Sequence, residues 1–256
     1  MRVVRFEHQG RAACGLVDGE SILPLAAAPW ETGGRPERAG TPVDRRSAKL
    51  LVPVVPSKIL CIGRNYRAHA AELGNEVPEK PLVFFKPPSS LLPHKGTVLL
   101  PPESSRVDYE GELAIVIGKR ARRLAGSEAL GAVFGYTVAI DVTARDLQKA
   151  DGQWWRAKGF DTFCPLGPAI ETDVDPSDLL LETLVDGAVK QSGRTSAMVH
   201  DVPALVAWAS HAMTLEPGDV ILTGTPEGVA PLVPGQTLEV RIGKVGSLSV
   251  HIEKEG

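Results

Sequence analysis

The feature that most constrains the fold of this chain is a pair of carboxylates that leads into an apolar strand. Residues 107–117 read Val-Asp-Tyr-Glu-Gly-Glu-Leu-Ala-Ile-Val-Ile. The part from Leu113 to Ile117 is rich in β-branched residues, which is typical of a strand that is buried on both faces. If the strand begins earlier, Glu110 and Glu112 point to the same face, roughly 7 Å apart along the chain. Such a pair requires a metal ion, a Lys or Arg, or open water.

A third carboxylate follows a second predicted strand. Residues 134–141 are apolar and end in Asp141. Oxygen ligands with no His or Cys beside them suit a hard cation such as Mg²⁺ or Mn²⁺. Gly111, between the two glutamates, indicates a position that a ligand or another backbone approaches closely. A bare Glu-x-Glu is more often the solvent face of an edge strand, so the surroundings must decide whether it is a site.

Composition excludes several classes of function. The 256 residues are 43% hydrophobic, which is enough for a sizeable core, and the net charge of −3 argues against binding to nucleic acid or an anionic membrane. No run approaches the ~18 apolar residues of a membrane helix. The N-terminus lacks the layout of a secretion signal. Three cysteines (Cys14, Cys61 and Cys164) form no metal-binding pattern, and we expect a cytoplasmic protein.

Turn and proline signals divide the chain in two. Residues 1–25 alternate like short strands, and residues 26–50 are irregular in composition. Prolines keep residues 51–56 extended. We therefore predict a small β-rich N-terminal domain over residues 1–55 and a main domain over residues 56–256. Short helices among many strands predict an α+β fold in which β-structure dominates.

The main domain opens with a strand and a short helix that carries a His and a Glu. The predicted helix runs from about Tyr66 to Leu73 and places His69 and Glu72 on one face. A neighbouring Glu raises the pKa of an imidazole and holds its orientation, as in a general base. An exposed pair with no function is the alternative. The polar residues 74–81 that follow could move with the helix as a lid.

Basic residues lie on both sides of the three carboxylates in the sequence. Lys86 ends a strand, either as a buried cation or as a solvated terminus. Thr143 is a candidate N-cap for a helix in which Arg145 and Gln148 lie one turn apart. Residues 152–168 are predicted to form a long irregular loop that carries Lys158.

The C-terminal part contains a hairpin, a helix and a glycine-flanked loop. Asp186-Gly187 predicts a type I′ turn. Asp201 is expected to cap a helix that ends near Met213. The loop of residues 224–229 lacks the P-loop spacing, and we expect its free amides and the Thr225 hydroxyl to hold a carboxylate.

Six of these segments, taken together and in order, resemble the fumarylacetoacetate hydrolase family in its short bacterial form. They are Gly63-Arg64-Asn65-Tyr66, Lys86-Pro87-Pro88, residues 108–113, residues 141–148, Lys158-Gly159-Phe160-Asp161 and residues 223–229. The resemblance covers about residues 58–252 and is looser before residue 55. It implies a mixed β-sandwich roll and a homodimer.

The resemblance also implies the roles of individual residues. Glu110, Glu112 and Asp141 would hold Mg²⁺ or Mn²⁺, and His69 with Glu72 would act as a dyad on a lid. Lys158 would stabilise an oxyanion. The residues that orient the substrate, a small 2-oxo acid, would be Arg64, Tyr66, Arg145, Gln148 and Thr225.

The reaction remains open because several reactions share one enolate intermediate stabilised by the metal. The first interpretation is an isomerase/decarboxylase of the 2-hydroxyhepta-2,4-dienedioate type, in aromatic catabolism. The alternatives are an acylpyruvate hydrolase of the fumarylpyruvate type, which cleaves a C–C bond, and an oxaloacetate decarboxylase. From another class, a non-catalytic 2-oxo-acid binding protein would leave Lys158 and the His69–Glu72 dyad without a role.

Overall fold

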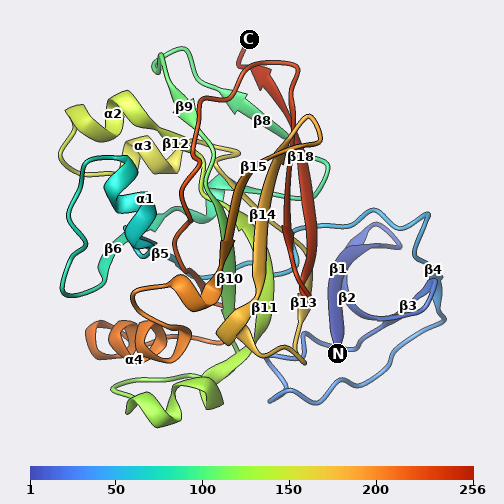
Figure 1. The fold of residues 1–256 in the computed structure, drawn as a ribbon. Helices are drawn as coiled ribbons and strands as arrows, with labels where there is room; N and C mark the ends of the chain where they lie inside the picture. The colour runs from blue at the N-terminus through green and yellow to red at the C-terminus, as the bar shows by residue number, and fades with distance from the viewer.

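A computed structural model describes residues 1–256 and shows two packed β-sheets with short helices along one flank (Figure 1). The larger sheet has 11 strands, with β7 (Leu91–Leu92) beside β13. Its other strands are, in spatial order, β4 (Val43–Asp44), β3 (Ser21–Pro24), β2 (Arg11–Asp18), β1 (Arg2–His8), β13 (Cys164–Glu171), β11 (Val133–Ile140), β10 (Gly111–Ile117), β16 (Val220–Leu222), β5 (Ile59–Gly63) and β6 (Leu82–Lys86). The expected α+β fold with dominant β-structure is confirmed.

The second sheet covers one face of the first and closes the core between them. Its five strands, in order, are β15 (Ala188–Arg194), β14 (Leu180–Val185), β17 (Thr237–Ile242), β18 (Gly246–Lys254) and β8 (Thr97–Leu100). Strands β14, β17 and β18 contact β10, β11 and β13 of the larger sheet. All seven residues of β10 are buried, as the apolar run predicts for a strand enclosed on both faces.

The N-terminal strands continue the larger sheet. Strand β1 pairs antiparallel with β13, with Val3 opposite Ile170. Val3, Trp30 and Val54 share a core cluster with residues of the main sheet. The domain boundary near residue 55 therefore stays a prediction, and residues 1–55 are joined to the rest by both a strand pair and a shared core.

Short helices gather beside β5 and β6, where the candidate site lies (Figure 1). They are α1 (Arg67–Glu72), α2 (Arg145–Ala150) and α3 (Trp155–Gly159), and α4 (Val202–Ala212) lies apart from them. Four 3₁₀ turns complete the set: η1 (Pro88–Ser90), η2 (Gly126–Ala132), η3 (Pro176–Asp178) and η4 (Thr195–Ala197). No helix is long and apolar enough to cross a membrane.

Two local predictions are confirmed. Asp201 caps α4, and its side chain accepts a hydrogen bond from the Ala204 amide. Asp186 and Gly187 both have positive φ, 49° and 81°, as a type I′ turn requires.

Two other local predictions are wrong. Thr143 does not cap α2, because it lies in β12 (Thr143–Ala144), which pairs with β9 (Val107–Asp108), and its hydroxyl donates to the Asp141 carbonyl. Residues 152–168 are not one irregular loop, because α3 and the start of β13 lie within them. A helix of five residues is too short to show an apolar period, and it is held by tertiary contacts instead.

Candidate active site

The carboxylates of Glu110, Glu112 and Asp141 form a buried cluster. Their nearest oxygens lie within 4.8 Å of one another. The strands bring them together, because Gly111 at the start of β10 pairs with Ile140 at the end of β11. At this edge the Asp141 amide donates to the Glu110 carbonyl over 2.8 Å. The sequence prediction that these three side chains converge matches this geometry.

Three basic side chains surround two of these carboxylates. Lys158 Nζ lies 2.8 Å from Glu110 Oε2 and 2.6 Å from Asp141 Oδ2. Arg145 Nη2 lies 2.6 Å from Glu110 Oε1, and Lys86 Nζ lies 2.7 Å from Asp141 Oδ1. Burial raises the pKa of Glu110, but Lys158 and Arg145 outweigh it and hold that pKa well below its usual range. Glu110 is therefore ionised and fully paired.

Glu112 differs from its neighbours because it forms no ion pair. Its Oε2 accepts a hydrogen bond from the Gly224 amide at 2.7 Å. Burial, then the charges of Asp141 and Glu110, raise the pKa of Glu112 well above its usual range. Asp141 Oδ1 also lacks a hydrogen bond, although the Lys86 ammonium is near. An all-oxygen donor set with one uncompensated carboxylate fits a divalent cation such as Mg²⁺ or Mn²⁺.

Lys86 and Asp108 hold Lys158 and Arg145 in place. The sequence left open whether Lys86 is a buried cation or a solvated strand end, and the structure shows that it is buried. Its Nζ donates to the carbonyls of Val142, Lys158 and Phe163, which fixes α3 and the chain after β11. Asp108, two residues before Glu110, accepts from Arg145 Nε at 3.0 Å. Sequence analysis did not assign Asp108, although its alternation with Glu110 and Glu112 is a usable signal.

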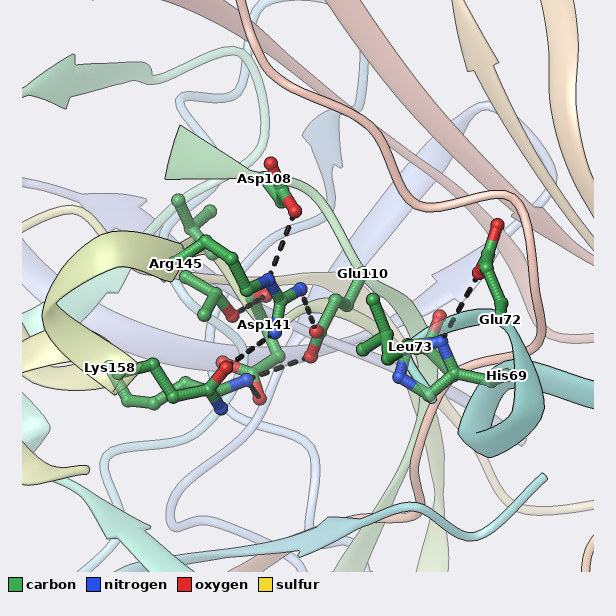
Figure 2. Close-up of polar contacts among 12 residues, drawn as sticks. His69, Glu72, Leu73, Asp108, Glu110, Asp141, Arg145 and Lys158 are labelled. Atoms are coloured by element: carbon green, nitrogen blue, oxygen red, sulfur yellow. Dashed lines mark hydrogen bonds and ion pairs between the residues drawn. The ribbon is translucent and has the colours of Figure 1, made fainter. Parts of the chain in front are cut away.

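His69 faces the cluster from α1, and Glu72 lies on the far side of His69, away from the carboxylates (Figure 2). Glu72 Oε2 lies 3.6 Å from His69 Nδ1, too far for a hydrogen bond, so the contact is electrostatic. Figure 2 shows the other ring nitrogen of His69 directed toward Glu110. Burial has the largest effect on the pKa of His69 and lowers it, as Arg145 and Lys158 also do, whereas Glu110 and, less strongly, Glu72 raise it. The expected effect of Glu72 is present, but burial outweighs it, and the net pKa of His69 is lowered.

The loop of residues 224–229 binds carboxylates of the protein itself. The Gly224 amide donates to Glu112, and the Gly228 amide donates to Glu72 at 3.1 Å. The Thr225 hydroxyl donates to the Gly111 carbonyl. The expectation that these amides and this hydroxyl are free is wrong, because they bind Glu72 of α1, Glu112 and the Gly111 carbonyl.

A cavity lies between α1, α3 and the carboxylates. Its volume, including the part that is open to solvent, is about 420 Å³. Two members of the cluster, Glu110 and Glu112, line it, and the other polar residues of its lining are Arg64, His69, Asn75, Arg145, Gln148, Lys158 and Thr225. Ile62, Leu73, Phe84 and Trp154 form an apolar wall that sequence analysis did not assign, because single apolar residues on separate elements carry no pattern.

Two of the predicted substrate-binding residues have distinctive positions. Arg64 lines the cavity, forms no ion pair and has φ of 57°, a strained backbone that often marks a functional position. Tyr66 does not line the cavity. Its ring is 2% exposed, and its hydroxyl has no hydrogen-bond partner.

Comparison with known proteins identifies the relatives of this chain. Residues 58–253 match the family described as fumarylacetoacetate (FAA) hydrolase C-terminal, and residues 1–53 match the family described as Rv2993c-like, N-terminal. The chain belongs to the fumarylacetoacetate hydrolase family. Protein Rv2993c of Mycobacterium tuberculosis is 43% identical, and the match covers 100% of this chain and 99% of the relative.

Two further members of the fumarylacetoacetate hydrolase family carry functional names. Oxaloacetate tautomerase YisK of Bacillus subtilis is 42% identical over 93% of this chain and 84% of its own. The crystal structure of 2-hydroxyhepta-2,4-diene-1,7-dioate isomerase from Mycobacterium marinum has a TM-score of 0.92 and 42% identity, covering 100% of this chain and 99% of that one. The fold and family expected from the sequence are confirmed.

Proposed function

We propose that this protein is a divalent-metal-dependent enzyme that moves a proton between the keto and enol forms of a compact 2-oxo diacid of the oxaloacetate type. The observation that carries the proposal is a buried imidazole, its pKa lowered chiefly by burial, that lines the same cavity as Glu110 and Glu112. A base in this state accepts a proton without first losing one. The choice of a short diacid follows the oxaloacetate tautomerase relatives, of which YisK is 42% identical.

The cation held by Glu110, Glu112 and Asp141 would supply Lewis-acid charge next to the substrate oxygens and make the adjacent C–H more acidic. His69 would take the proton from that carbon in the keto form and deliver it to the enolate oxygen to give the enol, and the reverse reaction would return the proton from the oxygen to the carbon. Glu72 would stabilise the imidazolium formed, since its carboxylate is 3.6 Å from Nδ1. Lys158 would place a positive charge beside the oxygen on which negative charge develops.

The remaining residues would bind and orient the substrate. Arg64 would pair with the distal carboxylate, because it is the cavity cation that has no partner in the protein. Gln148 accepts from Arg145 Nη1 at 2.6 Å and lines the cavity, which leaves its amide N–H groups for the substrate. The apolar wall of Ile62, Phe84 and Trp154 would exclude water from the reacting carbon.

A second candidate is isomerisation or decarboxylation of a 2-hydroxyhepta-2,4-dienedioate, and it is favoured by the similarity to the Mycobacterium marinum isomerase. It would use the same base and the same cationic groups. Hydrolysis of an acylpyruvate and decarboxylation of oxaloacetate remain alternatives that the same assay addresses. A homodimer is retained as a proposal from the family resemblance.

The test measures the ultraviolet absorbance of enol-oxaloacetate over time in the presence of the protein and Mg²⁺ or Mn²⁺. 2-Hydroxyhepta-2,4-dienedioate and an acylpyruvate are assayed in parallel, each as a separate substrate. We expect rapid, metal-dependent loss of the enol signal and little action on the longer compounds. His69→Gln should lower kcat about 10²- to 10⁴-fold while oxalate still binds. Faster turnover of the dienedioate would favour the second candidate. Full activity in His69→Gln would refute the assignment of the base.

A further inference from the structure

Gln191 is a buried polar side chain of the second sheet that has no role in the mechanism above. It lies on β15 and is 1% exposed. Its Oε1 accepts a hydrogen bond from the Gly111 amide at 3.0 Å. Its Nε2 donates to Thr225 Oγ1 and to the Pro226 carbonyl, both at 2.8 Å. Both amide hydrogens and the carbonyl oxygen are therefore used within the protein.

These contacts form a closed ring around the glycine that separates the two metal-site glutamates. The Thr225 hydroxyl donates to the Gly111 carbonyl at 2.8 Å. Gln191 binds the amide of the same glycine, and the two side chains bind each other. The peptides on both sides of Gly111 are thus fixed, and those peptides carry Glu110 and Glu112.

The larger sheet supports this segment on one side only, where Gly111 pairs with Ile140 of β11. Strand β16 pairs with β10 only at residues 114–116, so the start of β10 extends past the end of its neighbour. Gln191 and Thr225 occupy the place that a longer β16 would fill. The approach is close, because a Cβ at position 111 would lie 2.2 Å from Thr183 Oγ1. The second sheet therefore reaches the metal site through the backbone of Gly111.

We propose that Gln191 is a positioning residue for the metal ligands. Through the ring with Thr225 it sets the separation and orientation of the Glu110 and Glu112 carboxylates, and so it strengthens the binding of a divalent cation. This inference rests on the metal site proposed above. Side chains that orient metal ligands in this way typically contribute 10- to 100-fold in metal affinity.

The test is Mn²⁺ binding by isothermal titration calorimetry to wild type and Gln191→Met, which keeps the side-chain length and removes all three hydrogen bonds. We expect affinity to fall about 10- to 100-fold. The matched control is Thr195→Val, which removes the hydroxyl that accepts from the Leu179 amide and donates to the Pro176 carbonyl, away from the site. It should lower the melting temperature and leave Mn²⁺ affinity unchanged.

Thr225→Val removes the hydroxyl that joins Gln191 to the Gly111 carbonyl. This variant tests the inference if Gln191→Met does not fold. It should also weaken Mn²⁺ binding. The double variant should have the same Mn²⁺ affinity as whichever single variant binds Mn²⁺ less tightly, because either substitution alone already breaks the ring. Wild-type affinity in either single variant would overturn the inference, as would an equal loss in Thr195→Val. If wild type itself does not bind Mn²⁺, the proposed metal site fails, and this inference fails with it.

Discussion

Glu110 and Glu112 stand two residues apart, yet they have opposite electrostatic surroundings. Glu110 accepts hydrogen bonds from both Arg145 and Lys158. Glu112 accepts one from a backbone amide and has two carboxylates as its charged neighbours. The charge of Glu110 is therefore compensated by cations of the protein, whereas Glu112 forms no ion pair with any of them.

This difference predicts opposite effects for the same substitution. In EDTA, Glu110→Gln should cost about 3 kcal/mol of unfolding free energy, because it removes a buried charge shared by two cations and leaves Arg145 with Asp108 alone and Lys158 with Asp141 alone. Glu112→Gln should leave the melting temperature unchanged or raise it, since burial and the charges of Asp141 and Glu110 already disfavour the ionised form of this side chain. With saturating Mn²⁺, wild type should gain about 2.7 kcal/mol at a concentration 100 times Kd, and Glu112→Gln should gain almost nothing.

Thermal unfolding with and without Mn²⁺ measures both effects on the same samples. Stability in EDTA that falls by the same amount in the two variants would contradict the distinction between the glutamates. A Mn²⁺-induced shift retained by Glu112→Gln would contradict its assignment as a ligand.

At the scale of elements, α1 and the loop of residues 224–229 form one unit through Glu72 and the Gly228 amide. Gly228 is required there for two reasons. Its φ is 99°, and a Cβ would lie 2.2 Å from the Lys190 carbonyl oxygen. The loop can approach β15 and still present its amide to the helix only with glycine at this position.

Gly228→Ala should therefore push the loop away from β15 and release Glu72 from it. We expect kcat to fall about 10- to 100-fold, because the dyad loses its orientation. Gly235→Ala is the matched control, since Gly235 has a similar φ of 92° with nothing within 4 Å of its Cβ position. It should cost some stability and leave kcat unchanged. Equal kcat losses in both variants, or none in either, would argue against a link between this loop and α1.

For the whole molecule, the sequence predicted those features that depend on local pattern. The continuous apolar run predicted β10, and the ends of two strands predicted where Glu110, Glu112 and Asp141 lie. The Asp186-Gly187 turn and the Asp201 cap follow from backbone preferences alone. These signals are short in range, so no fold information was needed to use them.

Features set by long-range packing could not be predicted in the same way. Lys86 reads equally as a surface or a buried residue until α3 is placed against it, and Gln191 contacts Gly111 from another sheet. The sequence pattern that surrounds Tyr66 suggested a binding role, but the fold turns its ring into the core. The pairing of β1 with β13 was likewise invisible in the alternation of residues 1–25.

That pairing leads to a prediction about how residues 1–55 unfold. Trp30 is 6% exposed and packs edge-on against Phe134 of β11, with ring centroids 5.5 Å apart. A unit that shares a sheet and a core with the main domain should unfold with it in one cooperative transition. Trp30→Ala should therefore cost about 3 kcal/mol and lower the midpoint of that whole transition, because the cavity it leaves lies between the two parts. Urea unfolding followed by both circular dichroism and fluorescence measures this, with the 71% exposed Trp155 replaced by Ala as the control expected to keep the wild-type midpoint. An early separate transition in wild type or in Trp30→Ala would show instead that residues 1–55 form an independently stable domain, joined to the main domain only by the strand pair and a weak contact.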